Sequence, residues 1–538
     1  MDCETATKDP IIALPFDIIT DIFFRIPYGE RLILRRVSKS WNRELLSNCI
    51  LWQHIDFLSG KRPVRLADVE RSIAFADGVI QELYLEKLFR PEESLCVDAL
   101  MEASDRNPGA LRRLELNCYA PHFWTMDPHG SSSMGGKVRI DTFCNLTSLK
   151  IALDQADYFL RESLGQVTFS NLQELFIYAD RYRHYNRRGW IRAPTGLDGV
   201  PFPNLKLFKL GSQLAEEALQ EWELSYIGPV RYLKILMDQR LLHVLIAMMP
   251  NLEHLEIIRV AAGDSSGRAV KAVPMYLSRH SRLTYLNLTQ SSLDRNPLLP
   301  KNCKTLILDS SDVPTFATIF DRSHLDYDRE AFEKQSGSIE KYDISRQESL
   351  SNYEVMHQLS LLNPEAVTDL SLRLVCRHFW PDDRRRMSGI ARTLSRGVTV
   401  PDMSPIDYML QQLPNIERLN VSCTRVTDLA MDKISRFQRL EYLDVSGTAV
   451  TLQGVLYLLN PEVNGSKVNN SQTWRWSDEP WRSTTNLKTI ILKKCRHIDE
   501  STMEWLEDHG ITTGLRLSDD PEWVHLKNWD FKDMNHFR

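Results

Sequence analysis

Two Cys-Arg-His triplets carry the residue types that most often bind a metal ion or act as a nucleophile. They are Cys376–His378 and Cys495–His497. A structural zinc site needs four such ligands, usually as two closely spaced pairs, and neither triplet has a partner pair at that spacing. Glycine-rich phosphate loops and the His-Glu-x-x-His motif of metalloproteases are also absent from the sequence. We therefore expect no catalytic residue, no metal ion and no cofactor in this chain.

Residues 181–192 mix basic and aromatic side chains. The guanidinium groups of Arg183, Arg187 and Arg188 could pair with an acidic or phosphorylated peptide. The same composition would suit single-stranded nucleic acid. A solvated surface loop without a ligand is the simpler interpretation, and a formal net charge of −5 gives no overall basic field that would attract nucleic acid.

The strongest local pattern lies near the amino terminus, where Leu-Pro is followed by apolar residues at helical spacing. Proline at the first position can open a helix, and Ile18, Ile22 and Ile26 would then form one apolar stripe along it. A second apolar set continues at helical spacing, and Trp52 closes the segment. The residues that carry the pattern are Leu14, Pro15, Ile18, Ile22, Ile26, Leu34, Val37, Trp41 and Trp52.

This order of residues resembles the F-box, a short helical module that docks on a Skp-type adaptor of cullin–RING ubiquitin ligases. The resemblance runs without a gap from Leu14 to Trp41, although Arg31 stands where the family usually has an aliphatic residue and Ser38 where cysteine is common. Arg31 either extends its charged head to solvent along the helix edge or reduces affinity for the adaptor. The alternative is that three small amphipathic helices merely cap the domain that follows. The resemblance implies adaptor contacts by Leu14, Pro15, Ile18, Ile22, Leu34, Val37, Trp41 and Trp52.

A second pattern, apolar-x-x-apolar-x-apolar, recurs thirteen times between Ile80 and Leu492. Most copies lie 20 to 35 residues apart, close to the period of leucine-rich repeats. The alternation places two apolar side chains on one face of a short strand. Many copies follow a potential amphipathic helix, such as Arg240–Met249 or Asp428–Phe437. One strand and one helix cannot bury this face alone, so the units should stack into a curved solenoid with a concave parallel sheet.

Asparagine directly precedes the first apolar position in six copies, which unrelated strands would not produce. These residues are Asn145, Asn171, Asn204, Asn251, Asn415 and Asn486. The stretches Val421–Thr424, Val445–Thr448 and Leu492–Cys495 further resemble the cysteine-containing repeat subtype common in F-box proteins. The expected fold class is α/β: a small all-helical F-box followed by a leucine-rich-repeat solenoid with a concave parallel sheet and outer helices. A plain α/β domain with many parallel strands is the alternative.

The patterns divide the chain into an F-box at 10–57, a connecting helical segment at 58–77, a solenoid at 78–520 and a tail at 521–538. Long intervals between copies indicate loops inserted into the solenoid, which are common places for recognition. We expect the interval 309–365 to bulge from the solenoid or to be partly disordered. The predicted insertions are residues 120–140, 180–203, 309–365, 376–405 and 462–485.

Side chains between the apolar positions of each strand should point to the concave surface. Several are aromatic, and tyrosine and phenylalanine are enriched at binding sites. Inserted loops that cover this face would instead make them ordinary packing. The candidates for substrate contact are Tyr84, Phe176, Tyr178, Tyr232 and Tyr285, with Lys209, Lys234 and Tyr442 at equivalent positions.

Composition supports a large intracellular protein. The 538 residues are 43% hydrophobic, which is enough for a sizeable core, and the nine cysteines form no Cys-x-x-Cys pair. Free thiols of this kind favour a reducing compartment, so we expect the cytoplasm, the nucleus or both. The amino terminus is polar and unlike a signal peptide, and the longest apolar run, Leu241–Met249, is too short to span a bilayer.

The resemblance implies a substrate receptor of an SCF-type ubiquitin ligase. Its expected partners are a Skp-type adaptor, cullin and RING subunits through that adaptor, and a protein substrate of unknown identity; no membrane is expected, and nucleic acid is disfavoured. Two alternatives stay open: an adaptor-binding interaction protein without a role in ubiquitin transfer, and a repeat protein that binds nucleic acid.

Overall fold

A computed structural model gives two compact units, residues 1–257 and 258–538, which are described separately. The described residues are 14–57, 66–76, 79–86, 109–117, 144–152, 169–178, 202–213, 229–236, 249–257, 277, 280–289, 297, 299–309, 338–346, 352–360, 362–373, 375, 405–459, 486–495, 498, 500–508 and 510–513.

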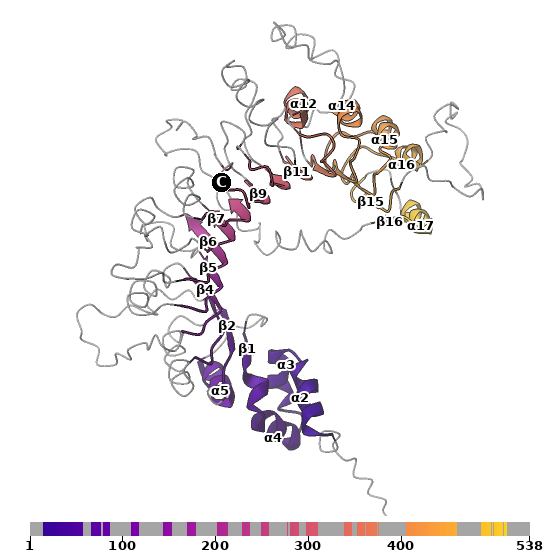
Figure 1. Cartoon of the computed structure of the whole chain (residues 1–538). Helices are drawn as coiled ribbons and strands as arrows, with labels where there is room; N and C mark the ends of the chain where they lie inside the picture. Colours follow the sequence, from indigo (N-terminus) through magenta and orange to yellow (C-terminus); the bar gives the residue numbers. More distant parts are fainter. Residues whose placement is uncertain are drawn as a thin grey trace, which may run out of the picture. The chain divides into compact units, whose positions relative to one another are not determined.

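The first unit begins with four short helices, drawn in indigo in Figure 1: α2 (Phe16–Phe24), α3 (Tyr28–Leu34), α4 (Lys39–Ser47) and the 3₁₀ helix η1 (Cys49–Trp52). Prolines precede two of them, since Pro15 and Pro27 occupy the N-cap positions of α2 and α3. A proline there costs no hydrogen bond, because the first turn has no acceptor for its N–H. Helix α2 ends at Phe24, so the predicted stripe loses Ile26, which lies beyond the helix.

Trp52 belongs to the core of the first unit, which corrects its predicted place among the adaptor contacts. Its side chain is fully buried, and its indole N–H donates to the carbonyl of Leu45 at 2.7 Å. The Tyr28 ring meets it edge-on with centroids 6.0 Å apart, and Phe75 of the following helix lies at 5.1 Å. Trp52, Ile55 and Phe57 have the spacing of the repeat pattern, so Trp52 is the first buried position of the first repeat.

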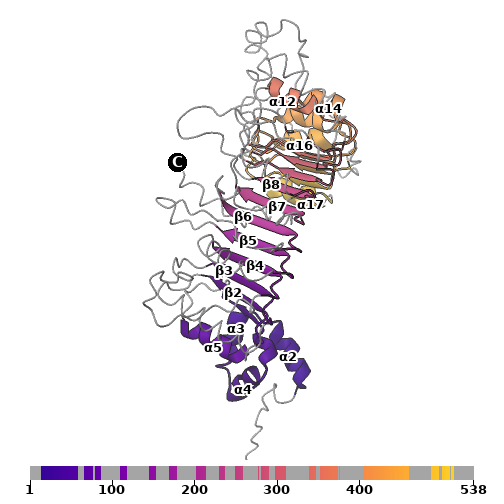
Figure 2. The ribbon, with the colours of Figure 1, turned by 60° about the vertical axis from the view of Figure 1, so that its left-hand side comes forward.

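A parallel sheet follows directly on these helices (Figure 2). Each strand pairs in parallel with the next along the chain, and seven of the predicted strands are confirmed in this unit. Strand β1, which the pattern did not predict, pairs with β2, and α5 (Leu66–Ala76) lies between them in the chain. The strands are β1 (His54–Asp56), β2 (Glu82–Glu86), β3 (Arg113–Asn117), β4 (Ser148–Ala152), β5 (Glu174–Tyr178), β6 (Leu207–Gln213), β7 (Tyr232–Leu236) and β8 (His254–Ile257).

The register aligns the middle apolar position of every repeat. Leu83, Leu114 and Leu149 are direct partners on β2, β3 and β4, and each is at most 2% exposed. The residues on either side of them in the strands face the other way, because side chains alternate across a sheet. One face of the sheet therefore carries a row of apolar side chains, and the opposite face carries a row of polar and aromatic side chains.

The recurrent asparagines connect successive repeats through their side-chain amides. Asn204 Nδ2 donates to the carbonyl of Ser170 at 2.7 Å, and Asn486 Nδ2 donates to that of Gln438 at 2.9 Å. Asn145 and Asn415 make the same kind of bond at 3.1 Å. Asn302 directly precedes Cys303 in the same way, although the six residues counted above omit it, and it donates to the carbonyl of Ser281 at 2.8 Å. Each of these five amides satisfies a carbonyl in the turn before a strand, whereas Asn171 Nδ2 donates to Asn145 Oδ1 at 3.0 Å.

The second unit repeats this plan with shorter strands. Its strands also pair in parallel and in chain order, and its helices lie between them in the chain. Helix α15 confirms the helix predicted at Asp428–Phe437, ending three residues earlier. The elements are β9 (Tyr285–Asn287), β10 (Thr305–Ile307), β11 (Lys341–Asp343), α12 (Asn352–Ser360), β12 (Asp369–Ser371), α14 (Pro405–Gln412), β13 (Arg418–Asn420), α15 (Asp428–Ile434), β14 (Tyr442–Asp444), α16 (Leu452–Leu459), β15 (Thr489–Ile491), α17 (Glu500–Asp508) and β16 (Thr512–Thr513).

The predicted insertion at 309–365 contains a repeat, which corrects the expectation that it bulges from the solenoid. Strand β11 pairs with β10 on one side and β12 on the other. Its middle buried position is Tyr342, whose hydroxyl donates to Gln358 Oε1 of α12 at 3.1 Å. The other predicted insertions lie outside the described residues, apart from residues 202, 203 and 405, as does the tail at 521–538.

A short polar turn follows several strands of the second unit. The side chain of the last strand residue accepts a hydrogen bond from the backbone N–H two residues later, at 3.0 Å from Thr289 to Asn287 and at 2.8 Å from Ser345 to Asp343. Asn420 accepts in the same way from Ser422 at 3.0 Å. An asparagine and an aspartate can both make this bond, because it needs only a side-chain oxygen.

Asp343→Asn should stabilise β11 at pH 7.5. Burial, reinforced by the charge of Asp309, raises the pKa of Asp343 to about 6 from 3.8. A raised pKa favours the folded state below pH 3.8, and this contribution is lost as the pH rises through about 6. The amide keeps the bond to Ser345 without the buried charge, so we expect a gain of roughly 1–3 kcal/mol at pH 7.5 and little change at pH 4. Amide hydrogen exchange of β11 at the two pH values measures this gain in stability. Faster exchange in the variant than in the wild type at pH 7.5 would contradict the prediction.

Candidate functional site

Exposed apolar side chains concentrate on the amino-terminal helices. Of the large hydrophobic residues that are exposed within the described ranges, only Leu429 lies outside residues 14–50. Ile18 and Ile22, one turn apart on α2, are each 44% exposed, and Val37 is 58% exposed. Concentration of this kind marks an interaction surface, whereas single exposed apolar residues are ordinary. We call these residues the N-terminal apolar surface: Leu14, Phe16, Ile18, Ile22, Phe24, Ile33, Val37 and Ile50.

Helix α2 positions this surface because it is apolar on two faces. Ile19 and Phe23 are buried against the other helices, whereas Ile18 and Ile22 point away from them. The predicted contacts Leu14, Pro15, Ile18, Ile22 and Val37 are all exposed. Phe16, Phe24, Ile33 and Ile50 were missed, because the sequence stripe counted only residues four apart and these fall outside it.

Leu34 and Trp41 differ from the other predicted contacts, since both are half-buried. The Trp41 ring meets Phe23 edge-on, with centroids 5.4 Å apart. Its backbone N–H donates at 3.1 Å to the side chain of Ser38, which caps α4. Trp41 therefore supports the fold of the helices with one side of its ring, and only the remainder is available to a partner.

Arg31 lies inside the helical module, so its charged head does not reach solvent. The side chain is 3% exposed, and its Nη1 donates to the carbonyl of Leu51 in η1. The guanidinium also lies 5.8 Å from the centroid of the Tyr28 ring. Burial lowers the pKa of Arg31, with the interaction with Tyr28 opposing it. Arg31 thus connects α3 to η1.

We expect Arg31→Ala to lower the stability of the helical module by roughly 2–4 kcal/mol. The substitution leaves a cavity between the helices and removes the donor to the buried Leu51 carbonyl. Amide exchange in α3 and η1 would report the change. Arg36→Ala is the matched control, because Arg36 is exposed on the same segment and should change stability by less than about 0.5 kcal/mol. Equal protection in wild type and the Arg31 variant would contradict this role.

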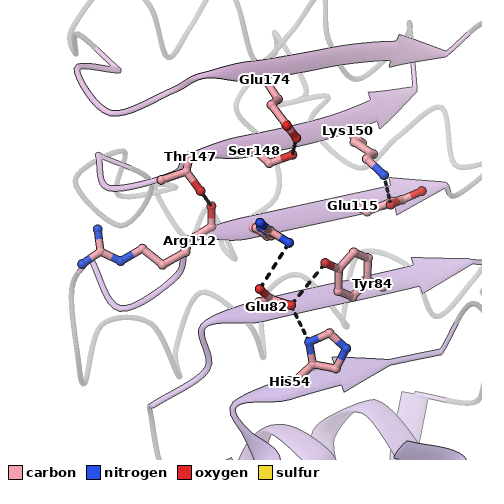
Figure 3. A network of polar contacts seen from close by, with 10 residues as sticks. His54, Glu82, Tyr84, Arg112, Glu115, Thr147, Ser148, Lys150 and Glu174 are labelled. Atoms are coloured by element: carbon pink, nitrogen blue, oxygen red, sulfur yellow. Dashed lines mark hydrogen bonds and ion pairs between the residues drawn. The ribbon is translucent and has the colours of Figure 1, made fainter. Parts of the chain in front are cut away.

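The polar face of the sheet in the first unit carries a hydrogen-bonded network that begins beside the helices (Figure 3). Glu82 on β2 is its centre: it contacts His54 Nδ1 on β1, accepts from the Tyr84 hydroxyl at 3.3 Å and lies 3.6 Å from Arg113 Nη1 on β3. Burial is the main cause that raises the pKa of Tyr84. Through Glu82, the four side chains form hydrogen bonds and ion pairs across the first three strands, and these contacts help to hold the strands in register.

Lysines and aromatic rings follow on the middle strands of the same face. Lys150 Nζ on β4 pairs with Glu115 Oε2 on β3 at 2.9 Å (Figure 3). The Lys209 ammonium on β6 lies 4.7 Å from the centroid of the Phe176 ring and 5.2 Å from that of the Tyr232 ring. Such distances are typical of cation–π contacts. The predicted residues Phe176 and Tyr232 are thus brought together around a lysine.

On β8, at the other end of this face, the Glu256 carboxylate accepts three hydrogen bonds. Lys234 Nζ donates at 2.7 Å and His254 Nε2 lies at 2.9 Å, while the Tyr232 hydroxyl donates to the same carboxylate. The Tyr232 and His254 rings stack with centroids 4.2 Å apart. Burial alone would raise the pKa of Glu256, but the bonds from His254 and Lys234 outweigh it and hold the value at about 2.

The remaining predicted residues are dispersed. Tyr84 lies on the same face of the first unit, whereas Tyr285 begins β9 in the second unit. The Tyr178 side chain and the loop residues Arg183, Arg187 and Arg188 lie outside the described residues.

The two Cys-Arg-His triplets lie largely outside the described ranges, which include only Cys495. Burial raises the pKa of the Cys495 thiol, and its sulfur lies 3.2 Å from the carbonyl of Val445. The described residues contain no group of three or more potential metal ligands. In the same part of the chain, no helix has both the length and the apolar character that crossing a bilayer requires.

Comparison with known proteins identifies the amino-terminal module. Residues 11–53 match the family model of the F-box domain. No curated protein sequence matches the chain. Among solved structures, that of a TLR13–ssRNA13 complex is similar with 13% sequence identity and a TM-score of 0.37; the match covers 82% of this chain and 59% of that chain.

Proposed function

Because the chain carries an F-box domain followed by leucine-rich-repeat-like parallel strands, we propose that it is the substrate-recognition subunit of an SCF-type ubiquitin ligase. The F-box would dock on a Skp-type adaptor and, through it, on cullin and RING subunits. The repeats would hold a protein substrate. The N-terminal apolar surface is the single observation that carries the proposal, because the fold leaves these side chains exposed where the F-box resemblance expects contacts.

The proposed docking surface consists of Leu14, Pro15, Ile18, Ile22 and Val37, with the accessible parts of Leu34 and Trp41. Phe16, Phe24 and Ile33 extend it. Burial of such side chains against an adaptor would contribute about 1.5–3 kcal/mol for each one fully removed from water. Trp52 and Arg31 act only indirectly, because both are inside the module.

The proposed role in ubiquitylation is positional rather than catalytic. Holding a substrate lysine near the charged ubiquitin-conjugating enzyme converts a rare encounter into an effectively intramolecular reaction. Such a receptor needs a rigid link between its two binding surfaces. In the first unit, Trp52 supplies part of that link, since it packs on the helices and is the first buried position of the repeats. We place this activity in the cytoplasm, the nucleus or both.

Affinity purification with mass spectrometry tests the proposal. The comparison uses the full-length chain and an Ile18→Glu/Ile22→Glu variant rather than a deletion of the F-box, because removing residues 1–57 would also remove β1 and expose the edge of β2. Adaptor and cullin should be lost from the variant, while substrates remain bound. Retained adaptor would contradict the proposal. Loss of adaptor with no bound protein whose ubiquitylation depends on the chain would favour an adaptor-binding role in assembly.

A further inference from the structure

Lys209 stands apart from the other lysines on the polar face of the first unit. Its neighbours Lys150 and Lys234 each pair with a carboxylate, at 2.9 Å with Glu115 and at 2.7 Å with Glu256. Lys209 has no carboxylate within ion-pair distance among the described residues; its contacts there are the rings of Phe176 and Tyr232. Glu174, the nearby carboxylate on β5, instead accepts from the Ser148 hydroxyl at 2.9 Å.

The sheet register places Lys209 at the centre of a built site. Phe176 on β5 and Lys234 on β7 are its direct partners across the strands. The side chains of Lys209, Phe176 and Tyr232 are half-buried, so a ligand can reach them without opening the core. The Tyr232 ring is fixed in turn by its stack on His254 and its bond to Glu256. The ammonium is therefore held in place between two rings.

Among the described residues, this arrangement leaves the Lys209 ammonium without a carboxylate at ion-pair distance. Of the three ammonium groups, those of Lys150 and Lys234 are neutralised by Glu115 and Glu256. Burial, reinforced by the charge of Lys234, lowers the pKa of Lys209, although the charges of Glu256 and Glu174 oppose this shift. An incoming carboxylate would offset the cost of burial, because it gives the half-buried ammonium a charged hydrogen-bond partner.

We propose that Lys209 binds the side-chain carboxylate of an aspartate or glutamate in the protein substrate, with Phe176 and Tyr232 contacting the residues that flank it. This inference rests on the proposed function, since it assigns a chemical class to the substrate of the same repeats. A single ammonium group matches a monoanionic carboxylate better than a dianionic phosphate. A lysine also lacks the forked guanidinium that recognises phosphate in a bidentate manner.

Short immobilised peptide pools that differ only in one fixed central residue test this inference on the full-length chain. The fixed residues are aspartate, glutamate, asparagine, glutamine and phosphoserine. We expect the acidic pools to be retained at least about tenfold better than the amide pools. Lys209→Met should abolish this preference, because methionine fills the space between the rings without a charge. Lys209→Arg should keep it.

Lys206→Met is the matched control. Lys206 lies just before the same strand and is exposed, with its Nζ donating to Gln173 Oε1 at 3.3 Å. Its loss should leave the preference for acidic pools unchanged. Adaptor capture should be normal in every Lys209 variant, and the Ile18→Glu/Ile22→Glu variant should retain the acidic preference. Failure of this site can thus be told apart from failure of the proposed docking on the adaptor.

Four outcomes would overturn the inference. The first is equal retention of acidic and amide pools by the wild-type chain, and the second is an acidic preference that survives Lys209→Met. The third is stronger retention of phosphoserine than of aspartate and glutamate, which would assign the site to phosphorylated peptides. The fourth is binding of single-stranded poly-uridine RNA that depends on Lys209, which would assign this face to nucleic acid.

Discussion

Replacing Ile18 and Ile22 together by glutamate should weaken adaptor binding at least about a hundredfold. Each residue is 44% exposed on the side of α2 that faces away from the other helices, so the substitutions add charge to this surface. Because only 44% of each isoleucine is left to bury, loss of its burial at the interface costs about 1 kcal/mol, and the desolvation of a carboxylate in its place adds to the loss. Calorimetric titration of the purified adaptor into the full-length variant measures the change.

Leu429→Glu is the matched control for this experiment. Leu429 is 62% exposed on α15, outside the N-terminal apolar surface, and its replacement should leave adaptor affinity unchanged. Circular dichroism should show that all variants keep their helix content. Wild-type affinity in the double variant would mean that a different surface docks on the adaptor.

Glu256→Gln should destabilise the first unit by roughly 3–5 kcal/mol. The substitution leaves the buried ammonium of Lys234, which is 5% exposed, without its carboxylate, and breaking one partner of a buried pair is costly. The pKa of Glu256, lowered from 4.5 to about 2, predicts a contribution of similar size. Because the folded pKa is the lower one, this stability is present above pH 4.5 and is lost as the pH falls toward 2. Amide exchange of β7 and β8 at neutral pH measures the loss.

A second substitution separates the charge effect from simple loss of packing. Lys234→Met in the Glu256→Gln background removes the buried ammonium that has lost its carboxylate. The double variant should therefore recover at least half of the lost stability. Protection of β7 and β8 that is unchanged in the single variant, or not recovered in the double variant, would show that the pair contributes little.

Sequence alone predicts the repeats whose three buried positions are aliphatic, such as β2 and β5 with Leu83 and Leu175. It tolerated Phe208 in β6 and Cys303 just before β10, but it missed two repeats in which a tyrosine or a tryptophan fills such a place. Strand β11 was missed because its middle position is Tyr342, which packs like leucine once Gln358 satisfies its hydroxyl. Strand β1 was missed because its flanking positions are Trp52 and Phe57. A pattern that accepts tyrosine and tryptophan as well as phenylalanine would have found both.

The candidate sites show the same limit. Helical spacing predicted that Ile18 and Ile22 share one face of a helix, and the resemblance to the F-box predicted that this face contacts an adaptor. The burial of Arg31 could not be predicted, since its partner is a backbone carbonyl of Leu51 that only the packing of η1 brings close. Among the described residues, Lys209 lacks a paired carboxylate because Glu115 pairs with Lys150 and Glu256 with Lys234. These pairs form between neighbouring strands, so spacing within one strand does not predict them.

The most direct measurement of the central claim is photo-crosslinking from the N-terminal apolar surface in the assembled complex. Benzoylphenylalanine at Ile22 of the full-length chain should crosslink to the Skp-type adaptor, whereas the same group at Leu429 should not. An adaptor crosslink at Ile22 is the result that our account predicts. Crosslinks from Ile22 only to other parts of this chain, while the adaptor stays bound, would show that this face does not dock on the adaptor.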